Sequence, residues 1–283
     1  MRRGAARSLG VVPDPEPSKP KLQLRGVRKS FPTQRGDRVL ALEDITFDVA
    51  PGEFVCLLGP SGSGKSTLLN VLAGLDSPDA GTVTMNGKPI TGPGPDRAVL
   101  FQEPALFPWM TVQGNVEFAL RMVGTPAADR PSVAARWLSK VHLARFADAQ
   151  PHELSGGMRQ RAALARALAC SPEVLLADEP FGSLDAQARE ALQVEVQRVW
   201  GETGTTFVFV THNVREAALL ADRVLLMSAG PGVLLEEYRI RVPRPRHLED
   251  ALLSRVVVDI HDRLSEEVSK VAARETGEPT GLG

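Results

Sequence analysis

Eight residues, Gly59 to Ser66, constrain this chain more than any other stretch of its sequence. They have the sequence Gly-Pro-Ser-Gly-Ser-Gly-Lys-Ser, directly after the apolar run 54–58 and before a segment of helical composition. A glycine-rich turn between a buried strand and a helix N-terminus exposes backbone amides toward a phosphate. The spacing therefore predicts an α/β fold with a phosphate-binding loop, in preference to an incidental turn that happens to contain a lysine.

Each part of this loop has an expected role toward a nucleoside triphosphate. Lys65 would reach between the β- and γ-phosphates, Ser66 would place its hydroxyl on Mg²⁺, and Thr67 would contact the α-phosphate. The residues expected to wrap around the β-phosphate are Gly59, Pro60, Ser61, Gly62, Ser63 and Gly64.

A second glycine motif, Leu154-Ser155-Gly156-Gly157-Met158, stands long after the first loop and just before a helical segment. Glycines at a helix start expose N–H groups at the positive end of the helix dipole, which favours an anion. Two candidate phosphate-binding sites in one chain indicate a function beyond simple nucleotide binding.

Two adjacent carboxylates, Asp178 and Glu179, follow the apolar run 174–177. Open α/β sheets bind their ligands at the carboxyl ends of such strands. Asp178 suits the Mg²⁺ shell, and Glu179 suits polarising a water as general base. The alternative, a solvated acidic strand end, is disfavoured by the phosphate loop in the same chain.

Gln102 and His212 each follow an apolar strand and are weak signals when taken singly. Taken alone, a histidine at a strand end is more often a structural hydrogen-bonding group than a catalyst. At the carboxyl ends of strands that line the same crevice, however, Gln102 would sense metal or water and His212 would bond the γ-phosphate.

This ordered set of motifs resembles the ATP-binding-cassette (ABC) ATPases over about residues 22–246. The resemblance implies a P-loop fold of RecA type, with a mainly parallel sheet, an antiparallel β layer and an inserted α-helical subdomain. It also implies ATP and Mg²⁺ as cofactors, and Glu179, His212, Gln102 and Lys65 as catalytic residues. Ser66, Gln102 and Asp178 are the implied metal ligands. Nucleotide-binding residues implied by the same match are Phe31 for the adenine, the loop from Gly59 to Thr67, the signature Leu154, Ser155, Gly156 and Gly157, and Asp185.

Within this family the chain is similar to importer subunits for nitrate, sulfonate and taurine, on the segments 101–109, 155–161 and 242–246. The implied partners are a second copy of the chain, two transmembrane permease subunits and, indirectly, a solute-binding protein, at the cytoplasmic face of the membrane. An exporter ATPase is the alternative; a non-transport ABC ATPase would normally show a coiled-coil insertion or a second cassette. The apolar residues after Gln102 are either a permease groove or subdomain core: Leu106, Phe107, Trp109 and Met110.

Composition excludes some classes of function. The formal net charge of -1 argues against a broadly basic nucleic-acid surface, so we expect no nucleic-acid partner. No run approaches the ~20 apolar residues that cross a bilayer. Cys56 and Cys170 lack metal-site spacing, which predicts buried thiols.

The expected organisation has three parts. Residues 1–20 form a proline-rich disordered tail, 21–246 the ABC ATPase domain with its helical subdomain at about 103–165, and 247–283 an amphipathic helix and tail. Alternating Ile45, Phe47 and Val49, and the Asn86-Gly87 pair, predict the antiparallel layer. The C-terminal helix would pack on its own core or bind a partner through a stripe of Leu248, Leu252, Val256, Ile260, Leu264 and Val268.

Overall fold

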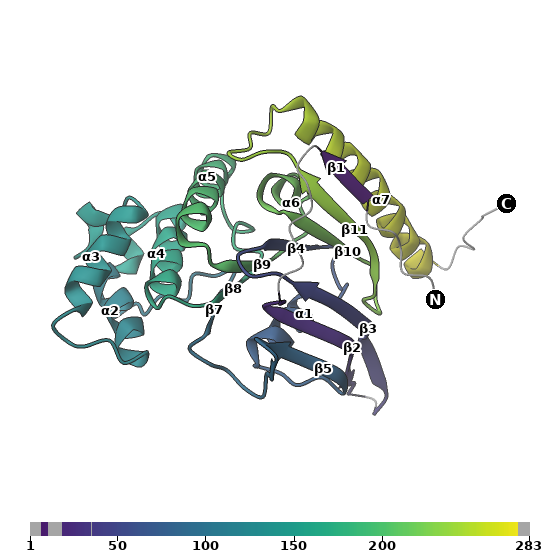
Figure 1. Ribbon diagram of the computed structural model, residues 1–283, viewed down its shortest axis with the longest axis horizontal. Coiled ribbons are helices and arrows are strands. Elements are labelled where there is room, and N and C mark those ends of the chain that lie inside the picture. Colours follow the sequence, from purple (N-terminus) through teal and green to yellow (C-terminus); the bar gives the residue numbers. More distant parts are fainter. Residues whose placement is uncertain (1–6, 11–18, 35, 277–283) are drawn as a thin grey trace. The chain divides into compact units, whose positions relative to one another are not determined.

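A computed structural model describes residues 7–10, 19–34 and 36–276 of the chain. The chain divides into two compact units (Figure 1). Unit 1 comprises Met1–Gly92 and Val208–Gly283, and unit 2 comprises Pro93–Phe207. Among the described residues, no helix is both long and apolar enough to cross a membrane.

Unit 1 holds most of a largely parallel sheet. In order, its strands are β1 (Arg7–Gly10), β11 (Leu234–Arg241), β10 (Arg223–Met227), β4 (Phe54–Leu58) and β9 (Thr206–Thr211), which crosses the unit boundary. Every residue of β4 and β9 is buried, as the apolar runs 54–58 and 207–210 predict for central strands. The helices of this unit are α1 (Lys65–Ala73), α6 (Val214–Leu220) and α7 (Ala251–Thr276).

An antiparallel sheet completes unit 1, with the order β3 (Arg38–Val49), β2 (Leu22–Pro32), β5 (Ala80–Met85) and β6 (Lys88–Pro89). Ile45, Phe47 and Val49 are buried, as their alternation predicts. Asn86 and Gly87 both have positive φ, 51° and 76°, which is the backbone that a tight hairpin between twisted strands requires. The predicted antiparallel layer is confirmed.

Unit 2 contains the parallel pair β7 (Arg97–Leu100) and β8 (Val174–Asp178), together with the helices expected from the sequence. Helices α2 (Val112–Met122), α3 (Arg130–Lys140) and α4 (Gly156–Ala169) pack on one another, and α5 (Ala186–Thr203) follows the second strand (Figure 1). Two short 3₁₀ turns, Ala144–Phe146 and Pro151–Glu153, precede α4. Helix α2 begins directly after Thr111, whose hydroxyl caps it by accepting the Gly114 N–H at 3.0 Å.

Helix α7 packs on α6 of its own unit, and Arg263 on α7 pairs with Glu236 on β11 at 3.0 Å. The predicted stripe is only partly correct, since Val256 and Ile260 are buried but Leu252 and Val268 are about half exposed. A four-residue repeat drifts by ~40° per step around a helix of 3.6 residues per turn, so its ends leave the buried face. The side chains that replace them on this face are Leu253 and Glu267.

The predicted N-terminal tail, residues 1–20, lies mostly outside the described residues. Its Arg7–Gly10 segment forms β1, parallel to β11, so the expectation of disorder is wrong for these residues. The strand supplies hydrogen-bond partners to an edge of β11 that would otherwise be open. Residues 277–283 of the predicted C-terminal tail also lie outside the described part of the chain.

Candidate nucleotide site

The predicted phosphate loop runs from the end of β4 to the start of α1. Gly62 and Gly64 have φ of 75° and 80°, a left-handed backbone that costs glycine nothing and other residues a steric clash. Gly64 caps α1, so the N–H groups of the first helical turn follow directly on the loop. This is the local structure that binds phosphate at a helix N-terminus.

Lys65 is folded onto this loop and is only 6% exposed. Its ammonium donates to the carbonyls of Gly59 at 2.9 Å and Pro60 at 2.7 Å, and to the Ser63 hydroxyl at 3.1 Å. The positive charge therefore lies within the turn that the glycines form. In the next two positions, Ser66 is exposed and Thr67 is half-buried.

A residue that the sequence did not single out, Gly232, closes one side of the loop. Its N–H donates to the Ala41 carbonyl and its own carbonyl accepts from Glu43, both at 2.9 Å. A Cβ at this position would lie 2.2 Å from the Ser63 carbonyl oxygen, which is part of the phosphate loop. The only sequence signal for this contact is the short Gly-Pro-Gly turn, 230–232.

We expect Gly232→Ala to weaken nucleotide binding about tenfold, because the new methyl group displaces the Ser63 carbonyl and with it the loop amides. Overpacking should also lower the free energy of unfolding by about 1–3 kcal/mol. Titration with a fluorescent ATP analogue and urea unfolding measure the two effects. Gly92→Ala is the control, since a Cβ there meets nothing within 4 Å. Equal affinities in the two variants would contradict the proposed contact.

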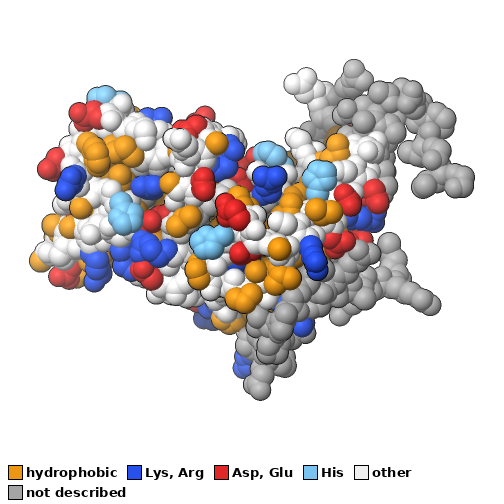
Figure 2. Space-filling view, turned by 90° about the horizontal axis from the view of Figure 1, so that it is seen from above, with side chains coloured by type: hydrophobic (Ala, Val, Ile, Leu, Met, Phe, Trp, Pro, Cys, Tyr) orange, Lys and Arg blue, Asp and Glu red, His pale blue; other side chains and the backbone are white. Residues whose placement is uncertain are grey.

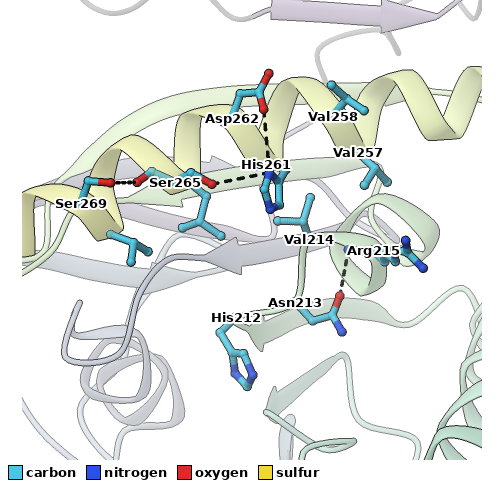
Figure 3. Close-up of a pocket in the computed structure, with 12 residues that line it drawn as sticks. His212, Asn213, Val214, Arg215, Val257, Val258, His261, Asp262, Ser265 and Ser269 are labelled. Atoms are coloured by element: carbon cyan, nitrogen blue, oxygen red, sulfur yellow. Dashed lines mark hydrogen bonds and ion pairs between the residues drawn. The ribbon is translucent and has the colours of Figure 1, made fainter. Parts of the chain in front are cut away.

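His212 and Phe31 are the other predicted site residues of unit 1. His212 directly follows β9, is exposed, and lines a groove of about 810 Å³ with side chains of α7, as Figure 3 shows. The Phe31 ring on β2 is 40% exposed, and the Lys29 ammonium lies 5.3 Å from its centroid. An exposed ring of this kind is free to stack on a planar base.

The predicted residues of unit 2 begin with the carboxyl ends of β7 and β8. The strands are parallel with Leu100 opposite Ala177, so Gln102 and Glu179 both follow them at the same edge. The Gln102 amide nitrogen lies 2.9 Å from the position that a Cβ on Gly182 would occupy, in the loop after Glu179. Glu179 has φ of 43°, a strained backbone for a residue with a side chain and one that clusters at functional sites.

The second glycine motif forms the start of α4, as its sequence predicts. Ser155 is the exposed N-cap, and its hydroxyl accepts the Met158 N–H at 3.3 Å, while Leu154 is buried. A Cβ on Gly157 would lie 3.1 Å from that of Ala188 on α5. The cap of α5 is Asp185, which accepts the Ala188 N–H at 2.9 Å, so this carboxylate has a structural role.

Helix α4 also holds the loop that carries Gln102, through contacts that no sequence pattern predicts. Gln160 is 1% exposed and donates to the Phe101 carbonyl at 3.0 Å. Arg166 donates to the carbonyls of Pro104 and Ala105 at 3.0 and 2.7 Å. The glycine motif and the glutamine loop are thus tied together within unit 2.

The apolar residues after Gln102 differ in their surroundings. Phe107 packs edge-on against Phe118 at 4.8 Å between centroids, and Asn115 accepts its N–H at 2.7 Å. Trp109 is 71% exposed. Phe107 is thus half-buried against α2, whereas Trp109 is available at the surface.

Neither Cys56 nor Cys170 forms a disulfide bond. Cys56 is buried, as predicted, whereas Cys170 is only half-buried, so the prediction is wrong for the second thiol. Burial raises the pKa of Cys56 well above its usual value and also raises the pKa of Cys170. The described residues contain no cluster of three His, Cys, Asp or Glu side chains suited to a metal. The predicted Mg²⁺ ligands, Ser66, Gln102 and Asp178, offer instead the oxygen donors that this ion prefers.

Charged side chains of both signs are interspersed over the face seen in Figure 2.

Each unit gathers its own set of predicted site residues. Unit 1 carries Phe31, the loop from Gly59 to Thr67 and His212; unit 2 carries Gln102, the motif from Leu154 to Gly157, Asp178, Glu179 and Asp185.

The chain is similar to known proteins over most of its length. Residues 42–182 match the family described as ABC transporter. The nitrate import ATP-binding protein NrtD of Synechocystis sp. is 46% identical over 222 residues, 78% of this chain and 83% of that protein. The taurine import ATP-binding protein TauB of Roseobacter denitrificans is 46% identical over 219 residues, 77% of this chain and 82% of that protein.

A solved structure of an ATP-binding cassette also resembles this chain. A dimeric ATP-binding cassette in a post-hydrolysis state, bound to ADP and Pi, superposes with a TM-score of 0.68 at 32% identity. The match covers 78% of this chain and all of that one. The expected fold, a P-loop core with a parallel sheet, an antiparallel layer and a helical subdomain, is confirmed. The chain belongs to the ABC transporter family, in the group of ATP-binding subunits that includes those of nitrate and taurine importers.

Proposed function

We propose that this chain is the ATP-hydrolysing subunit of an ABC importer, and that it couples ATP binding and hydrolysis to solute uptake through separate permease chains. The observation that carries the proposal is the phosphate loop itself, with two left-handed glycines and a buried lysine on a central strand. The loop amides and Lys65 bind the phosphates, Thr67 contacts the α-phosphate, and Phe31 stacks on the adenine.

Hydrolysis is an in-line attack of water on the γ-phosphorus. The water oxygen forms the new bond to phosphorus, the bond from the γ-phosphorus to the bridging oxygen breaks, and ADP and phosphate leave. Glu179 orients the water and accepts its proton, while Lys65 and His212 stabilise the charge on the γ-phosphate and Gln102 senses the water. The strained backbone of Glu179 supports this assignment.

Mg²⁺ would be held by the oxygen atoms of Ser66, Gln102 and Asp178. When bound, the ion neutralises negative charge on the phosphates. Within this chain, Ser66 presents its hydroxyl from the first turn of α1, and Asp178 presents its carboxylate from the end of β8.

The active form is a dimer in which the signature of each copy completes the nucleotide site of the other. Leu154, Ser155, Gly156, Gly157 and Asp185 act on the nucleotide bound by the second copy. The dimeric cassette that resembles this chain supports the arrangement. The exposed position of Ser155 at the start of α4 leaves its hydroxyl accessible to a second molecule.

The partners in the membrane are two permease chains, and a solute-binding protein delivers a small anion or a sulfonate-like solute to them. The names of the nitrate and taurine relatives support both the direction of transport and the solute class. The chain would act as a peripheral subunit on the cytoplasmic face of the membrane. Trp109, which is 71% exposed, is the contact we assign to the permease, together with its sequence neighbours Leu106 and Met110.

We expect Trp109→Ala to lower co-purification with the permease chains at least tenfold, because an exposed tryptophan at an interface commonly contributes more than 1.4 kcal/mol. The experiment co-expresses a tagged permease pair with the chain and quantifies the bound ATPase subunit. Phe146→Ala is the matched control, an aromatic residue of the same unit that is 42% exposed. If both variants bind the permease as the native chain does, Trp109 is not the contact.

A further inference from the structure

His212 stands in a short loop between β9 and α6. The residues on either side of it, Thr211 and Asn213, are hydrogen-bonded to each other. Thr211 is the last residue of β9 and Asn213 is the N-cap of α6, so His212 is the single residue between them. Figure 3 shows His212 and Asn213 side by side on this loop, with the Asn213 side chain bonded to Arg215. The loop contains no glycine, and its conformation must be held by other contacts.

One hydroxyl bridges the loop across His212. The Thr211 hydroxyl donates to a carboxylate oxygen of Glu216 at 2.6 Å and accepts the Asn213 N–H at 3.0 Å. A threonine hydroxyl has one proton to donate, so a bond to the carboxylate directs its lone pairs toward the backbone N–H. Glu216 thereby determines which way the hydroxyl points.

Both groups are buried, which strengthens the bond between them. Thr211 is 2% exposed and Glu216 is 6% exposed. A hydrogen bond to a buried carboxylate is stronger than one between neutral groups. Asn213 adds a second clamp, because its side-chain oxygen accepts the N–H groups of Arg215 and Glu216 at 2.9 and 3.4 Å.

Helix α6, which carries Glu216, is itself anchored at its carboxyl end. Arg246 is 3% exposed and donates to the carbonyls of Ala218 and Ala221 at 3.2 and 2.6 Å. Arg244 donates to the Leu220 carbonyl at 2.6 Å. The carboxylate of Glu216 therefore has a fixed position from which to hold the loop.

We infer that Glu216 is a positioning residue for His212, and that it acts through the Thr211 hydroxyl to fix the backbone from which the imidazole extends. The inference rests on the proposed role of His212 at the γ-phosphate. A catalytic group must be held within about 0.5 Å of its working position, and a displacement of about 1 Å costs on the order of a hundredfold in rate. Because the phosphate loop and Lys65 make most of the proposed contacts to ATP, the position of His212 should affect turnover more than ATP affinity.

The test measures ATPase turnover of the full chain after Thr211→Val, which keeps the shape and removes the hydroxyl. We expect kcat to fall about 10- to 100-fold while the KM for ATP stays within about twofold. Thr211→Ser, which retains the hydroxyl, should recover kcat to within about threefold of the native chain. Thr206→Val, at the other end of β9 and equally buried, is the control and should leave kcat within about twofold.

The decisive arm repeats Thr211→Val in a His212→Ala background, where a residue that acts only through His212 has no further effect. The same fold-loss in both backgrounds, or none in the native background, overturns the inference while the proposed function stands. Unchanged turnover in His212→Ala alone removes the proposed role of this histidine, and the inference with it. If Thr211→Val does not fold by circular dichroism, Glu216→Ala and Glu216→Gln replace it, with loss expected in the first and partial retention in the second.

Discussion

Glu179→Gln is expected to bind ATP as tightly as the native chain but to lower turnover by about 10²- to 10⁴-fold. The amide keeps the shape of the side chain and its hydrogen bonds but cannot accept a proton from the attacking water. Because the carboxylate follows β8 on a strained backbone, its position is set by the fold and is retained in the amide. Phosphate release under saturating ATP measures the loss.

Two further variants separate chemistry from binding. Glu190→Gln changes an exposed glutamate on α5 of the same unit and should leave turnover unchanged. Lys65→Ala removes the charge within the phosphate loop and should abolish ATP binding itself. Full ATPase activity in Glu179→Gln would show that another group acts as the base.

Ser155→Arg should have the second large effect, a loss of turnover of at least about 10²-fold with ATP affinity of the single chain unchanged within about twofold. The phosphate loop of the same copy is untouched, whereas a long cation at the start of α4 blocks the approach of a second copy. Steady-state turnover and titration with an ATP analogue measure the two quantities.

Loss of the cap at Ser155 is a separate effect and needs its own control. Removing an N-cap hydroxyl costs about 1 kcal/mol of stability. Thr111→Ala removes the equivalent cap from α2, where Thr111 accepts the Gly114 N–H, and should cost the same stability without loss of turnover. If Ser155→Arg turns over ATP as Thr111→Ala does, the signature does not act across a dimer.

The central strands and the phosphate loop could be predicted from the sequence because their physical requirements are local. A strand buried on both faces needs an unbroken apolar run, and β4 and β9 have one. A left-handed turn needs glycine, and Gly62 and Gly64 stand where φ is positive. The Asn86-Gly87 hairpin follows from the same rule.

Contacts between distant segments could not be predicted in this way. The bond from Gln160 to the Phe101 carbonyl joins residues 59 positions apart, and no local pattern encodes it. The approach of Gly232 to Ser63 is of the same kind. In α7, an apolar repeat of four residues followed the helix only in part, since its period differs from 3.6.

The hydrogen bond from Thr211 to Glu216 has a sequence signal that can be recognised only once the structure is known. A threonine closes a strand directly after the apolar run 207–210, and a glutamate follows five residues later on the next helix. Either residue alone is compatible with an ordinary cap or a solvated helix face. Their burial, which depends on how α6 packs, is what distinguishes the bridge.

The most direct test of the account is the mass of the Glu179→Gln chain in solution, measured by sedimentation velocity with and without ATP and Mg²⁺. We expect a monomer of 30.5 kDa without nucleotide and a species of about twice that mass with it. Adding Ser155→Arg to the same chain should return the ATP-bound protein to the monomer. A Glu179→Gln chain that binds ATP to saturation and remains a monomer would contradict the claim that two copies share the nucleotide site.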